Sequence, residues 1–123
     1  MYEVDSQGFV HQFNEGASHS VNFGQTRYSK GNTILHNHPS GSNLSPTDLR
    51  TFANTKQKAI SAVGNKNTYT ITKGTHFNST KFLTGLNKAK AKSNDYTKEA
   101  DKWLKDNQKK YGYTYTKEKT KVK

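Results

Sequence analysis

The stretch TILHNHPSGSNLSPTD, residues 33–48, constrains the fold of this chain more than any other segment. It begins with a β-branched and apolar run at 33–35, which predicts a buried strand with His36 and His38 at its end. Because side chains alternate along an extended chain, both imidazoles are expected on the same side of the strand. The residues that follow are rich in proline, serine and glycine and predict a tight turn.

The end of the same stretch predicts the start of a helix. Ser45 fits the N-cap, Pro46 the first helical position, and Asp48 the acidic position of a capping box. A strand end, a tight loop and a helix start would bring His36, His38 and Asp48 together. Two imidazole nitrogens and one carboxylate leave one position of a tetrahedral ion open, which is the ligand count of catalytic zinc. Each residue alone is more often structural, but the three in this context predict a metal site.

This pattern resembles the signature of the JAMM zinc metalloproteases, also called the MPN+ or JAB-domain family, in which His-x-His-Pro precedes a loop and Ser-x-x-Asp. The matching residues are His36, His38, Pro39, Ser45 and Asp48, and nine residues separate His38 from Asp48, one fewer than the family pattern. The resemblance is to the bacterial, phage or toxin-associated branch. It implies a zinc ion (Zn2+) held by His36, His38 and Asp48, a metal-bound water, and Ser45 helping to stabilise the oxyanion.

The resemblance also implies a glutamate upstream of the histidines as general base. Two glutamates precede them, and Glu15 lies in an Asn-Glu-Gly turn, which is a poor platform for a catalytic base. Glu3 lies close to the first predicted strand and is the candidate. In the family register, however, the turn at residues 4–8 would put the glutamate before Met1. A base-deficient member that binds zinc and turns over slowly or not at all is therefore left open.

Hydrophobic patterns predict an α+β fold with a single domain over residues 1–116 and a basic disordered tail over 117–123. The resemblance implies an MPN/cytidine-deaminase-like mixed β-sheet flanked by helices. The expected strands are 8–13, 20–23, 33–35, 59–64, 68–72 and 111–116, and the expected helices are 46–58 and a long C-terminal helix at 79–110. Gly85 and residues 93–94 weaken the last helix, so a kink or two helices is left open.

Positive charge is concentrated in the second half of the chain. The net charge is +11, and residues 56–123 carry 17 lysines against five acidic residues, whereas residues 1–55 are close to neutral. Such a half could bind nucleic acid or an acidic partner in a salt-dependent way, with Tyr111, Tyr113 and Tyr115 stacking on bases. It could equally be a solvated surface without a partner, and we favour a strand for the tyrosines.

These observations predict a zinc-dependent hydrolase of peptide or isopeptide bonds acting on a protein or peptide substrate, such as a ubiquitin-like, phage or toxin protein. The alternative is a catalytically deficient JAB-like zinc-binding module whose lysine-rich half binds nucleic acid or an acidic partner. A metal-dependent nuclease fits the motif less well. The sequence shows no apolar run long enough to cross a membrane and no classical signal peptide, so we expect a cytoplasmic protein, with non-classical secretion as an effector left open.

Overall fold

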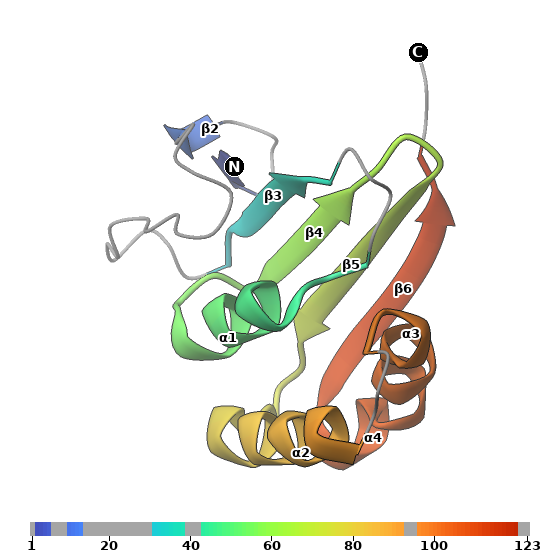
Figure 1. Cartoon of the computed structure of the whole chain (residues 1–123). Coiled ribbons are helices and arrows are strands. Elements are labelled where there is room, and N and C mark those ends of the chain that lie inside the picture. The colour runs from blue at the N-terminus through green and yellow to red at the C-terminus, as the bar shows by residue number, and fades with distance from the viewer. Residues whose placement is uncertain (1, 6–9, 14–30, 39–42, 93–95, 121–123) are drawn as a thin grey trace.

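The computed structural model describes residues 2–5, 10–13, 31–38, 43–92 and 96–120, and Figure 1 shows the arrangement of their helices and strands. In chain order the elements are β1 (Tyr2–Val4), β2 (Val10–Phe13), β3 (Thr33–Asn37), α1 (Pro46–Asn54), β4 (Ala59–Val63), β5 (Asn67–Lys73), α2 (Ser79–Lys92), α3 (Tyr96–Asp106), α4 (Gln108–Tyr111) and β6 (Tyr113–Lys119). The fold is therefore α+β. No helix in these ranges is long and apolar enough to cross a membrane.

The strands form one mixed sheet in the order β2-β1-β3-β4-β5-β6. Strands β3 and β4 are parallel, and the other neighbouring pairs are antiparallel. Parallel neighbours need a crossover connection, and α1 supplies it. The histidine motif therefore lies at the carboxyl end of β3, where the chain leaves the sheet to enter α1 (Figure 1).

The core lies on one face of the sheet, between the central strands and the helices. Ile34, Ile60 and Ile71 are paired across β3, β4 and β5 and are fully buried. Six rings pack at the end of this core near α2, and we call them the aromatic cluster: Phe52, Phe77, Phe82, Trp103, Tyr111 and Tyr113. Phe82 contacts each of the other five rings. Burying such large side chains is the main stabilising term available to a chain with so few apolar residues.

Several predicted elements are confirmed, with changed ends. The helix predicted from Pro46 is α1, which ends at Asn54, and the predicted strand pair is the hairpin of β4 and β5. The last predicted strand is β6 at the edge of the sheet, but Tyr111 belongs to α4 and the strand continues to Lys119. Residues 117–119 are therefore strand and not tail, because their backbone pairs with β5.

The long C-terminal helix predicted at 79–110 is not confirmed. The structure has α2, α3 and α4 in this stretch, and the turn between α3 and α4 lies at Asn107, whose side-chain amide donates to the carbonyl of Trp103. A straight helix over 79–110 would be about 48 Å long. The shorter helices allow both Phe82 and Trp103 to reach the same aromatic cluster.

At the amino-terminal edge, β2 confirms part of the first predicted strand, and it pairs with β1, which the sequence analysis did not predict. Strand β1 separates β2 from β3 in the sheet. The predicted strand at 20–23 and Glu15 lie outside the described residues, as do most of the turn after His38 and residues 121–123.

Candidate metal centre

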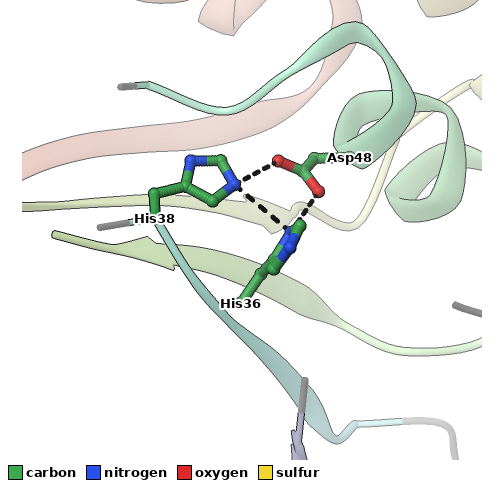
Figure 2. Close-up of side chains that lie close together, drawn as sticks. All are labelled: His36, His38 and Asp48. Atoms are coloured by element: carbon green, nitrogen blue, oxygen red, sulfur yellow. Dashed lines mark hydrogen bonds and ion pairs between the residues drawn. The ribbon is translucent and has the colours of Figure 1, made fainter. Parts of the chain in front are cut away.

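Strand β3 presents the two histidines on one side of the sheet. His36 pairs with Ala62 of β4, and the backbone N–H of His38 donates to the carbonyl of Val63 at 2.9 Å, which extends the parallel pairing by one residue. The backbone is therefore extended through His38, as the predicted alternation of side chains requires. Both imidazoles point toward Asp48 of α1 (Figure 2).

The start of α1 holds Asp48 in place. Its backbone N–H donates to Ser45 Oγ at 3.1 Å, and the N–H of Ser45 donates to Asp48 Oδ2 at 3.0 Å. This reciprocal pair is a capping box, and Pro46 follows the cap as predicted. The partial positive charge at the helix N-terminus also favours a carboxylate at this position. Asp48 is 1% exposed, so its carboxylate is both oriented and buried.

The three side chains meet at short distances. Asp48 Oδ1 lies 2.7 Å from His36 Nδ1, and Asp48 Oδ2 lies 3.1 Å from His38 Nε2. His36 Nδ1 and His38 Nε2 are 3.2 Å apart. Tetrahedral zinc with bonds of about 2.0–2.1 Å separates neighbouring ligand atoms by roughly 3.3 Å. The donor atoms therefore need only a small separation to surround an ion, and in the described part of the chain these residues form a group that could hold a metal.

The two oxygens of Asp48 have different surroundings. Oδ2 accepts from the backbone N–H of Ser45 and lies 3.1 Å from His38 Nε2, whereas Oδ1 lies 2.7 Å from His36 Nδ1. Because the Ser45 N–H already engages Oδ2, we take Oδ1 as the candidate ligand atom, and this N–H orients the carboxylate. Carboxylates that ligate metals are commonly held in this way by an outer hydrogen bond.

Opposing effects act on the pKa of Asp48. Burial raises the pKa, but hydrogen bonds from His36, His38 and the Ser45 backbone outweigh this and hold the pKa of Asp48 well below its ordinary value. The carboxylate is thus ionised at neutral pH, as a metal ligand must be.

The three side chains differ in their exposure to solvent. The side chain of His36 is 19% exposed, against 9% for His38 and 2% for Asp48. A water or substrate ligand would therefore approach an ion held by this group from beside His36.

The structure describes the side-chain contacts of Ser45 but only the strand position of Glu3, the other two predicted site residues. Ser45 is the N-cap of α1, and its hydroxyl accepts from Asp48 but keeps its own hydrogen for a further acceptor. Glu3 lies on β1 and pairs with Ile34, two residues before His36, so its strand is next to the strand of the histidines. The side chain of Glu3 lies outside the described part of the structure.

The sequence analysis missed one residue that contacts the motif. The hydroxyl of Tyr115, on β6, accepts a hydrogen bond from Asn43 Nδ2 at 2.7 Å. Tyr115 was expected as one tyrosine of an edge strand or, as the alternative, of a base-stacking surface. Nothing in its local pattern indicates a partner 72 residues away.

Comparisons with protein-family models, curated proteins and solved structures gave no match to this chain. The resemblance to the JAMM family therefore depends on the sequence motif alone.

Proposed function

We propose that this chain is a JAMM-like, zinc-dependent hydrolase of peptide or isopeptide bonds with an MPN-like fold. The observation that carries the proposal is the meeting of His36, His38 and Asp48 where β3 ends and α1 begins. Two imidazoles and one carboxylate with one accessible side form the ligand set of a hydrolytic zinc site.

The donor atoms assigned to the ion are His36 Nδ1, His38 Nε2 and Asp48 Oδ1. When bound, zinc would lower the pKa of a water ligand to about 7 and polarise the substrate carbonyl. The backbone N–H of Ser45 keeps the carboxylate of Asp48 in orientation through Oδ2. The hydroxyl of Ser45 is assigned as a donor to the oxyanion of the tetrahedral intermediate.

Glu3 is assigned as the general base. Its carboxylate would accept a proton from the attacking water and deliver it to the nitrogen of the leaving amine. The support is its register beside Ile34 on the strand next to β3. A carboxylate at this place would complete the set of groups that amide hydrolysis requires.

The substrate class proposed is a protein or peptide that binds in an extended conformation, as a ubiquitin-like tail or a phage or toxin protein segment would. An extended segment can add its backbone hydrogen bonds to those of a protein strand.

A second candidate function is a zinc-binding module without efficient turnover that binds nucleic acid or an acidic partner. The observation that favours it is the exposure of lysines on the last two helices and the last strand: Lys102, Lys105, Lys109, Lys110, Lys117 and Lys119. Binding through such charges would weaken steeply with salt.

The test uses the full chain loaded with one equivalent of Zn2+ and a panel of quenched fluorescent peptides and isopeptide-linked conjugates. Wild type should hydrolyse at least one substrate, and a chelator should stop the reaction.

Asp48→Asn and His38→Ala should lose both zinc and hydrolysis. Glu3→Gln should retain zinc and lose hydrolysis by about 100-fold or more. Arg50→Ala, an exposed change on α1, is the matched control.

Zinc binding without hydrolysis of any substrate, combined with salt-dependent binding of a DNA or RNA probe, would favour the second candidate. A wild-type chain that binds no zinc, or hydrolysis that persists in Asp48→Asn, would overturn the proposed function.

A further inference from the structure

The hydroxyl of Tyr115 joins three parts of the chain. It donates to Asp101 Oδ1 of α3 at 2.8 Å and accepts from Asn43 Nδ2 at 2.7 Å. Asn43 Oδ1 in turn accepts the backbone N–H of Leu44 at 2.6 Å. Tyr115 is 5% exposed, whereas Asn43 is half-buried and the side chain of Asp101 is 34% exposed, so the tyrosine is the shielded member of this polar path. A hydroxyl on a buried tyrosine is costly to leave without hydrogen-bond partners.

Asn43 belongs to the segment that leads into the metal centre. It precedes Leu44, which is 1% exposed and packs in the core, and Ser45, which caps α1. The capping box then fixes Asp48. The side chain of Asn43 is therefore held by β6 just before the chain turns to present its carboxylate ligand.

We propose that Tyr115 is a positioning residue of the metal centre: by holding Asn43 against Asp101, it keeps the segment from Asn43 to Asp48 in the conformation that binds zinc. The inference builds on the proposed zinc site. Tyr115 itself is not assigned as a ligand. It acts through the loop, as outer groups that orient metal ligands do.

The chain offers a matched control two residues away. Tyr113 lies on the same face of β6, is also 5% exposed, and its hydroxyl donates to the carbonyl of Leu104 on α3 at 2.6 Å. Replacing either tyrosine by phenylalanine removes a hydrogen bond from a buried tyrosine of β6 to α3. Only the change at Tyr115 also removes the contact with Asn43.

The experiment measures Zn2+ affinity by competition with a chromogenic chelator, and the absorption spectrum of the Co2+-loaded chain. Tyr115→Phe and Asn43→Ala should each weaken zinc binding by about tenfold. The double variant should lose little more than either single variant, because both changes break the same link. Tyr113→Phe should bind zinc within about twofold of wild type and keep its Co2+ spectrum, whereas Tyr115→Phe should change the spectrum.

Unfolding of each metal-free variant in urea supplies the second readout. Tyr113→Phe and Tyr115→Phe should lose similar stability while differing in zinc affinity. Equal zinc affinities of the two variants, or wild-type affinity in both Asn43→Ala and Tyr115→Phe, would overturn the inference. Asn43→Ala changes a half-buried loop side chain and keeps the test valid if Tyr115→Phe does not fold.

These outcomes are separable from those for the proposed function. If the zinc affinities differ as expected but wild type hydrolyses no substrate, the positioning role stands and the enzymatic role falls. If wild type binds no zinc, both fall.

Discussion

The metal centre and the aromatic cluster are held together by different forces. His36, His38 and Asp48 are joined by polar contacts of 2.7 to 3.2 Å and by the capping box of α1. The rings of the aromatic cluster pack with centroids 5.1 to 6.1 Å apart. Polar contacts fix the orientation of the side chains, whereas ring packing stabilises the fold mainly by burying apolar surface. The difference indicates that the first region fixes the orientation of three polar side chains, whereas the second supplies stability.

Helix α1 belongs to both regions. Asp48 lies in the metal centre and Phe52, one turn later, lies in the aromatic cluster, and both side chains are buried. Residues four apart share a helix face. At the end of α1, the ammonium of Lys73 donates to the carbonyl of Thr55 and lies over the ring of Phe52. The aromatic cluster thus packs against the helix that carries Asp48.

The largest expected effect on stability follows from removing the central ring. Phe82→Ala should lower the free energy of unfolding by about 3–5 kcal/mol, because Phe82 is fully buried and contacts five other rings. Urea unfolding of the metal-free chain measures this, with the exposed Lys81→Ala as control. The folded fraction of Phe82→Ala should still bind zinc. A zinc affinity as low as that of Asp48→Asn would show that the two regions are not separable.

Zinc should stabilise the chain through the metal centre alone. At a free zinc concentration 100 times the dissociation constant, the free energy of unfolding should rise by about 2.7 kcal/mol. Thermal unfolding with zinc and with chelator measures the difference. His38→Ala should show no such rise, and Tyr113→Phe should show the full rise. A rise of equal size in His38→Ala would place the bound zinc elsewhere.

A smaller effect is expected at Gly85 of α2. A Cβ at this position would collide with the hydroxyl of Tyr111, so Gly85→Ala should destabilise the chain by about 1–2 kcal/mol despite the better helix propensity of alanine. Adding Tyr111→Phe should recover part of the loss in urea unfolding. Asn87→Ala, exposed on the same helix, should be neutral or slightly stabilising. Stabilisation by Gly85→Ala would contradict the close packing of the aromatic cluster.

The smallest effect is a dependence of stability on pH. The pKa of Asp48 is held below its ordinary value of 3.8 by the hydrogen bonds from His36, His38 and Ser45, which outweigh the effect of burial. The ionised carboxylate therefore stabilises the folded state above that ordinary value, and this contribution is lost as the pH falls below it. The stability difference between metal-free wild type and Asp48→Asn should be smaller at pH 3 than at pH 6. The same stability difference at both pH values would show that the hydrogen bonds to Asp48 do not stabilise its ionised form.

The candidate site could be predicted because its determinants are local in the sequence. The alternation of β3 and the capping box of α1 each involve residues at most three apart, so His36, His38 and Asp48 could be placed together before the fold was known. The hairpin of β4 and β5 was predictable for the same reason.

The features that sequence analysis missed depend on distant contacts. The link from Asn43 to Tyr115 spans 72 residues, and the division of the predicted C-terminal helix follows from packing on a shared aromatic cluster. Gly85 was interpreted as a weak point in a helix, but its small size makes room for Tyr111. Strand β1 was missed because three residues give too short a pattern to identify a strand.

The central claim is that one metal ion binds between His36, His38 and Asp48, and a crystal structure of the zinc-loaded chain with anomalous data at the zinc edge tests it most directly. The account predicts one anomalous peak within bonding distance, about 2.0–2.2 Å, of His36 Nδ1, His38 Nε2 and a carboxylate oxygen of Asp48. No peak between these three residues, or a peak held by other side chains, would contradict it.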